Sequence, residues 1–159
     1  WSWTVTFFTQ ERRYTQKSAS QLISIFAVAM IAGRYGDKWV LTALGPDETV
    51  LISVVGAVLC LAAMFSLPGK TAIVVATLVA GLFMAAIYPT AVGMAAQLFP
   101  ALIGTAISLV ITAGWIGAIA IPPAVGFVAE RSGVRRAILI PVGAAALMLI
   151  SPIALMYLR

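Results

Sequence analysis

Five long apolar stretches follow one another along this chain, and they leave little room for any fold outside a lipid bilayer. A helix needs about 20 residues to cross roughly 30 Å of hydrocarbon. Of the 159 residues, 62% are apolar and only 9% are charged, whereas a soluble domain is about half apolar and about a quarter charged. We therefore expect an all-α integral membrane protein with several spans. The predicted spans are residues 18–35, 49–67, 71–98, 102–129 and 137–158, and residues 1–9 are expected to be the end of a further, partial helix.

The composition also excludes several classes of function. Histidine is absent and Cys60 is the only cysteine, so we expect no metal site, no disulfide and no histidine-based catalysis. No acidic residue lies in the middle of a predicted span, which argues against an intramembrane enzyme, and we expect no cofactor. The net charge of +5 comes mainly from short segments between apolar stretches. That pattern is typical of membrane topology and not of a nucleic-acid-binding face.

Two segments carry nearly the same polar pattern at the end of an apolar stretch. In residues 33–38 and again in residues 126–131, an acid follows a glycine by four positions and a base follows the acid. Three predicted spans separate these two signatures, and because three is odd the signatures should face opposite sides of the membrane. Helix triplets related in this way form inverted repeats, which are typical of secondary transporters. The residues expected to act in gating or at a domain interface are Gly33, Arg34, Asp37, Lys38, Gly126, Glu130 and Arg131.

The first signature resembles the loop motif between helices eight and nine of the major facilitator superfamily. It departs from that motif at residues 39–41, where Trp, Val and Leu stand in place of a glycine and further bases. The second signature resembles the degenerate copy of the motif between helices eleven and twelve. The resemblance implies the C-terminal half of a twelve-helix transporter. Residues 1–9 would be the end of helix 7, the five spans would be helices 8 to 12, and a six-helix N-terminal half would be missing.

Four short patches are similar to the sugar–proton symporter branch of that superfamily, which includes the fucose symporter and bacterial glucose/galactose transporters. This resemblance implies a sugar-like substrate, a coupled proton and a location in the plasma or inner membrane. The carboxylate that carries the proton would lie in the missing half. The patches are Trp1-Ser2 followed by Glu11, residues 33–35 (Gly-Arg-Tyr) with 39–41, residues 88–90 (Tyr-Pro-Thr), and residues 123–128 (Pro-Ala-Val-Gly-Phe-Val).

Three side chains within the spans are candidates for contact with a substrate. Tyr88 lies beside Pro89, where a kink can open a helix toward a cavity, and a phenol can both pack on a sugar and hydrogen-bond to it. Trp115 and Gln21 are further candidates. A packed core tyrosine at position 88 and a solvated turn at residues 33–38 are the alternative interpretations. At the level of the whole protein, the alternatives to sugar transport are a drug or metabolite efflux transporter and a non-transporting membrane fragment.

The positive charges disagree with the orientation that the resemblance implies. Seven of the ten Lys and Arg residues lie on the face that holds the segments around residues 11–17, 70 and 131–136, and three lie on the other face. The positive-inside rule places the seven in the cytoplasm, whereas the resemblance makes Arg34 and Lys38 cytoplasmic. Because early helices usually set the orientation, we expect the arrangement that the resemblance implies.

Overall fold

The computed structural model describes residues 2–150, and all regular secondary structure in this part of the chain is helical. Four of its helices are long and apolar enough to cross a membrane: α2, α3, α4, and the helix formed by η1 with α5. In a bilayer a helix satisfies its own backbone hydrogen bonds, which explains why the apolar stretches take this form. The elements are α1 (Ser2–Gln10), α2 (Gln16–Leu44), α3 (Pro46–Ser66), α4 (Lys70–Leu98), the 3-10 turn η1 (Pro100–Leu102), α5 (Ile103–Ser132), α6 (Val134–Ala137) and α7 (Leu139–Leu147).

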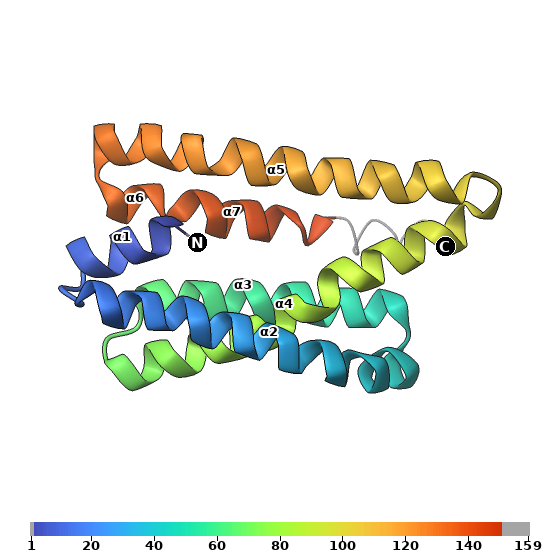
Figure 1. The fold of residues 1–159 in the computed structure, drawn as a ribbon, viewed down its shortest axis with the longest axis horizontal. Helices are drawn as coiled ribbons and strands as arrows, with labels where there is room; N and C mark the ends of the chain where they lie inside the picture. The colour runs from blue at the N-terminus through green and yellow to red at the C-terminus, as the bar shows by residue number, and fades with distance from the viewer. Residues whose placement is uncertain (1, 151–159) are drawn as a thin grey trace.

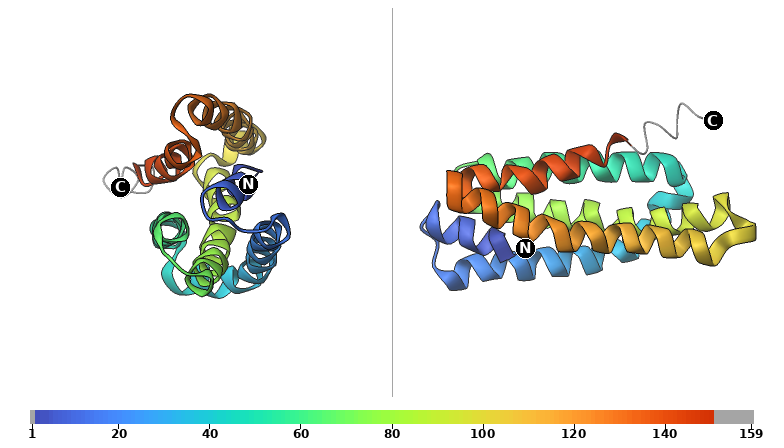
Figure 2. Two further views of the ribbon diagram at one scale, coloured as in Figure 1. Left: turned by 90° about the vertical axis from the view of Figure 1, so that its left-hand side faces the viewer. Right: turned by 90° about the horizontal axis from the view of Figure 1, so that it is seen from above.

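The long helices lie side by side in two groups, as Figure 1 shows. Helices α2, α3 and α4 form one group, and α5 forms the other with α6 and α7. The end-on view in Figure 2 places the short helix α1 between the groups. Helices α2, α4 and α5 have 29, 29 and 30 residues, which at 1.5 Å per residue is about 45 Å. They are thus longer than the hydrocarbon layer and reach the head-group depth.

The first predicted span, residues 18–35, is too short at both ends, because helix α2 covers Gln16–Leu44. Helix α2 starts earlier because Thr15 caps it, its hydroxyl oxygen accepting a hydrogen bond from the Ser18 N–H at 3.2 Å. The helix continues to Leu44 because residues 35–44 contain no proline and only one glycine. A single residue, Gly45, then separates α2 from α3. Its φ of +87° is one that side chains disfavour, and Pro46 starts the next helix.

The last two predicted spans also differ from the structure. The span predicted at 102–129 continues to Ser132, where Gly133 ends it with a φ of +84° and an N–H bonded to the Ala129 carbonyl. The basic segment between the last two predicted spans, residues 130–136, is therefore largely helical, as the last turn of α5 and as α6. The span predicted at 137–158 corresponds to α7 and the end of α6, and its residues 151–158 lie outside the described part of the chain.

Small residues let α2 and α4 approach closely. A Cβ atom added to Gly81 would lie 2.7 Å from the Phe26 carbonyl oxygen and 2.8 Å from the Ala29 Cβ. A Cβ atom added to Gly33 would lie 2.7 Å from the Ala85 Cβ. Lipid chains are as apolar as the helices themselves, so close packing of this kind is a main source of helix association in a membrane. These glycines therefore fix the spacing between the two helices.

The largest buried cluster joins both helix groups at one end of the molecule. Phe7 and Phe8 of α1 lie at its centre, and their rings meet the Phe65 ring at centroid distances of 5.1 and 6.1 Å. This contact connects α1 to the end of α3. The buried members of the cluster are Phe7, Phe8, Ala19, Leu22, Met64, Ile73, Ala76, Val134 and Ile138.

Candidate functional site

The first signature is a stretch of helix α2 and not a turn. Gly33 is buried against α4, while Arg34 and Lys38 are exposed. Asp37 follows Gly33 by four residues and so lies on the same face of the helix. One carboxylate oxygen of Asp37 is buried, and it has no hydrogen-bond partner among residues 2–150. The signature therefore combines a tight helix contact with a carboxylate whose hydrogen-bonding capacity is incompletely used.

The register between α2 and α4 places this carboxylate near a kink. The two helices run in the same direction (Figure 1), and Gly33 lies against Ala85. One helical turn further on, Asp37 in α2 is at the level of Pro89 in α4. Pro89 cannot donate a hydrogen bond to the Ala85 carbonyl, so α4 is weakened at this level. A charged group and a deformable helix segment thus occur at the same depth.

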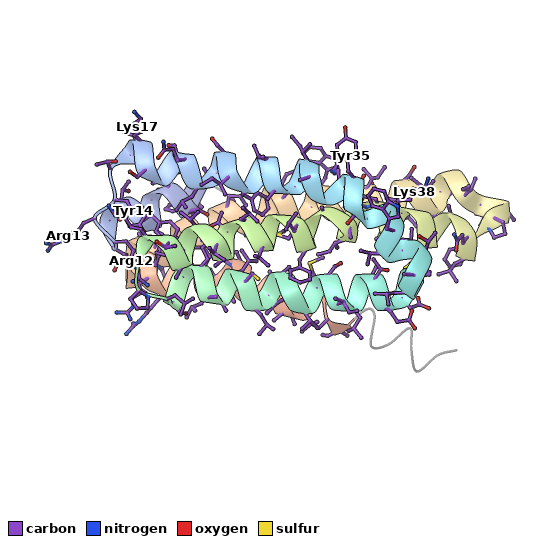
Figure 3. The ribbon with its side chains drawn as sticks, turned by 90° about the horizontal axis from the view of Figure 1, so that it is seen from below. Arg12, Arg13, Tyr14, Lys17, Tyr35 and Lys38 are labelled. Carbon is purple, nitrogen blue, oxygen red and sulfur yellow. The ribbon has the colours of Figure 1, made fainter. Side chains whose placement is uncertain are left out.

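Beyond Lys38, the last turns of α2 cross the end of the bundle toward α3, as Figure 3 shows. The Thr42 hydroxyl donates to the Lys38 carbonyl at 2.6 Å, an arrangement that often accompanies helix bending. Trp39 is 71% exposed, and Leu41 is also exposed. Exposed apolar side chains on a helix that crosses the bundle end suit the membrane interface. In the sequence, this segment is marked by Trp, Val and Leu at residues 39–41, where the motif that residues 33–38 resemble has a glycine and further bases.

The second signature lies at the end of α5. Gly126 faces the Trp3 ring, since an added Cβ atom would lie 3.1 Å from Trp3 Cζ2. The Trp3 indole N–H donates to the Pro122 carbonyl at 3.1 Å, which ties α1 to the proline-containing part of α5. Glu130 and Arg131 are exposed, and the Arg131 guanidinium lies over the Phe127 ring at 4.0 Å. Packing against Trp3 therefore accounts for the glycine of this signature.

The two signatures lie at opposite ends of the bundle. In Figure 1, α2 ends near the start of α3, and α5 ends at the opposite end of the bundle, where α1 also ends and α2 starts. Figure 3 shows the same separation, with Arg12, Arg13, Tyr14 and Lys17 at one end and Lys38 toward the other. The structure therefore does not bring the two signatures together into one charged site.

The three substrate candidates lie on different helices, and all are open to their surroundings. Tyr88 of α4 is 49% exposed, Trp115 of α5 is 63% exposed, and Gln21 near the start of α2 is exposed. Tyr88 is therefore not packed in a core formed by residues 2–150. This degree of exposure leaves all three side chains accessible to a solute, to lipid or to another part of the protein.

Helix α5 presents an uncovered face with a polar stripe that the sequence analysis did not identify. Val125 is the one buried residue that α5 contributes among residues 2–150. Thr105, Ser108 and Thr112 are exposed and lie at helical spacings of three and four residues, in line with Trp115 one turn further on. The spacing of these residues in the sequence could have predicted that they share one face of a helix. The stripe combines hydroxyl groups with an aromatic ring on one helix face.

The described residues hold no cluster of metal-ligating side chains. Within residues 2–150, no three His, Cys, Asp or Glu side chains come together in a way that could hold a metal ion. The polar chemistry of these helices consists of hydroxyls, an indole, a phenol and charged groups near helix ends. Such groups can bind and release a solute by hydrogen bonding and stacking.

Comparison with known proteins gives a match at the level of a family. Searches among curated proteins and among solved structures found no match to the chain. The profile of the Major Facilitator Superfamily matches residues 2–159, which is nearly the whole chain. The match agrees with the four membrane-length helices described above. The chain therefore belongs to the Major Facilitator Superfamily, whose members are integral membrane proteins that transport small molecules.

Proposed function

We propose that the intact protein is a secondary active transporter that moves a small polar solute, a sugar in particular, by alternating access. The observation that carries the choice of solute is the uncovered face of α5. Hydroxyl groups of Thr105, Ser108 and Thr112 can exchange hydrogen bonds with a sugar, and the Trp115 ring can pack on its apolar face. Tyr88 of α4, half-exposed beside Pro89, supplies a second aromatic group of this kind.

The proposed transporter includes a further six-helix half that covers the α5 face. The described acids lie outside the middle of the long helices, so the carboxylate that carries a coupled proton belongs to that other half. Asp37 serves the conformational cycle instead. Its incompletely bonded carboxylate takes a base or a helix N-terminus as a partner in one conformation and loses that partner in the other.

The test of this function is a counterflow assay on the complete protein in proteoliposomes. Vesicles are loaded in turn with fucose, glucose, galactose, an amino acid or a lipophilic cation, and uptake of the labelled form is followed. Accumulation with at least one sugar, and not with the amino acid or the cation, is the expected result. Uptake of the sugar should also rise when a proton gradient directed inward is imposed. If none of the three sugars gives counterflow, the proposed substrate class is overturned.

Efflux of an apolar drug or metabolite is the second candidate function. It is favoured by the apolar side chains on the same helix, because Leu109, Ile116 and Ile119 are between 62% and 70% exposed. Counterflow with the lipophilic cation alone would support it over sugar transport.

Changes at Tyr88 should separate a substrate contact from a merely structural role. The Tyr88→Phe variant keeps the ring and loses the hydroxyl, so we expect the half-saturation constant for the sugar to rise about tenfold, the effect of one hydrogen bond of ~1 kcal/mol or somewhat more. Tyr88→Ala should raise it further. The matched control is Tyr35→Phe, since Tyr35 is an exposed tyrosine of α2 outside the proposed path. An unchanged constant in both Tyr88 variants would remove Tyr88 from the substrate site.

The proposed orientation places residues 33–38 in the cytoplasm of a cell whose plasma or inner membrane holds the protein. We expect a Ser132→Cys variant, made in a Cys60→Ala background, to react with a membrane-impermeant maleimide added to intact cells. A Gly36→Cys variant should react only after the membrane is opened. Reaction of Ser132→Cys only in opened cells would reverse the orientation and would agree with the charge distribution.

A further inference from the structure

A hollow of about 1130 Å³ opens at the end of the bundle where α1, α3 and α5 end. Four arginines from different parts of the chain line it, and Glu11 is the one acid among its lining residues within the described part of the chain. Their convergence was not visible in the sequence, because more than 100 residues separate the first of them from the others. The arginines are Arg12, Arg131, Arg135 and Arg136.

Glu11 offsets only part of the positive charge of this hollow, since four arginines line it. Within residues 2–150, none of the four guanidinium groups forms an ion pair with a carboxylate. Two of them are already held in place. Arg12 donates from Nη2 to the Phe65 carbonyl at 2.8 Å, and Arg131 lies over the Phe127 ring at 4.0 Å. Arginines that are held and lack an anionic partner are prepared to bind phosphate, because the guanidinium fork matches phosphate oxygens.

The walls of the hollow and its depth favour a lipid over a dissolved anion. Phe7, Phe65 and Leu139 line it beside the arginines, so an apolar surface adjoins the charged one. The hollow lies at the ends of membrane-length helices, which is the depth of lipid head groups. A phospholipid would place its phosphate among the arginines and its glycerol and upper acyl chain against the aromatic wall. Basic pockets between membrane helices bind lipid head groups on the cytoplasmic side of membranes, and the same pairing of arginine with phosphate operates in any leaflet that contains anionic lipid.

We infer that this hollow binds the phosphate of an anionic phospholipid. A phosphatidylglycerol-like head group fits this site, since it offers phosphate oxygens to the arginines and carries a net negative charge. A zwitterionic head group brings its own ammonium toward the arginines and should bind more weakly. The assignment holds for either membrane orientation, because it depends only on the depth and the charge of the hollow.

The test measures lipid binding to the complete protein in a neutral detergent. Short-chain phosphatidylglycerol, phosphatidylcholine, glycerol 3-phosphate and inorganic phosphate are titrated separately. Native mass spectrometry counts bound lipid, and thermal unfolding reports stabilisation. We expect phosphatidylglycerol to bind at least tenfold more tightly than phosphatidylcholine. The double variant Arg135→Gln with Arg136→Gln should weaken phosphatidylglycerol binding by about tenfold or more, because each basic residue near a lipid surface contributes roughly fivefold.

The matched control is the double variant Arg13→Gln with Lys17→Gln. It removes the same charge at the same end of the bundle, but neither residue lines the hollow. Phosphatidylglycerol affinity close to that of the unchanged protein in this control supports a defined site. An equal loss of phosphatidylglycerol affinity in both double variants would mean that the lipid is attracted only by the overall positive charge at this end of the bundle. That result would overturn the inference. Binding of glycerol 3-phosphate or phosphate as tightly as the lipid would overturn the assignment to a membrane lipid.

Discussion

Replacing Gly81 by alanine is expected to destabilise the protein by about 1–3 kcal/mol, the usual cost of overpacking a close contact. The added Cβ atom would lie 2.7 Å from the Phe26 backbone oxygen and 2.8 Å from the Ala29 Cβ. Neither neighbour is the mobile end of a side chain, so α2 and α4 would have to move apart. The separation would weaken dispersion contacts along both helices, which are a principal source of their association in lipid. Gly33→Ala should act in the same direction, because its Cβ would lie 2.7 Å from the Ala85 Cβ.

The measurement is the midpoint of thermal unfolding in detergent, and the controls lie on the same two helices. Gly93 of α4 and Gly36 of α2 have no atom within 4 Å of an added Cβ. Alanine is the better helix former by about 1 kcal/mol, so Gly93→Ala and Gly36→Ala should leave the midpoint unchanged or raise it. Gly81→Ala and Gly33→Ala should lower it by several degrees. The same sign of change at all four positions would contradict the proposed close contact.

Asp37→Asn should slow transport by about tenfold or more while leaving the fold intact. Asparagine has nearly the same shape as aspartate but no charge, so it cannot form the charge-assisted bond proposed for one conformation of the cycle. Bonds to charged groups are worth about 1.5–3 kcal/mol, which corresponds to a shift of roughly 10- to 100-fold between two conformations. The incompletely bonded carboxylate oxygen at the level of Pro89 is the structural reason to expect this effect at Asp37.

Two measurements together test the role of Asp37. The initial counterflow rate reports transport, and the maleimide labelling rate of the Ser132→Cys variant in the Cys60→Ala background reports the conformational equilibrium. Glu48→Gln is the matched control, because it removes one negative charge at the same end of the bundle from an exposed side chain outside the signature. It should change transport less than twofold. Full transport and unchanged labelling in Asp37→Asn would mean that the carboxylate has no role in the conformational cycle and is only a charged group at the membrane boundary.

The helices of this protein could be placed from the sequence wherever a strong breaker ends an apolar stretch. The span predicted at 71–98 differs by one residue from α4, because Gly69 and the Phe99-Pro100 pair bound it. The prediction failed at α2, which continues nine residues beyond the predicted end at residue 35. Charged side chains do not interrupt a helix that reaches the head-group depth, and the backbone continues until Gly45. The polar stripe on α5 was present in the sequence as a helical spacing but has meaning only once its face is seen to be uncovered.

The sequence by itself determined that this is a membrane protein of long helices with a repeated charged signature. Those properties follow from hydrophobic length and from local patterns, which do not depend on how the helices pack. Only the tertiary structure decided which glycines are contacts, since Gly33 and Gly81 meet a neighbouring helix and Gly36 and Gly93 do not. It also decided that Arg12 joins three arginines from the end of α5 and from α6 around one hollow. Both outcomes depend on contacts between residues far apart in the chain, and no local pattern specifies those contacts.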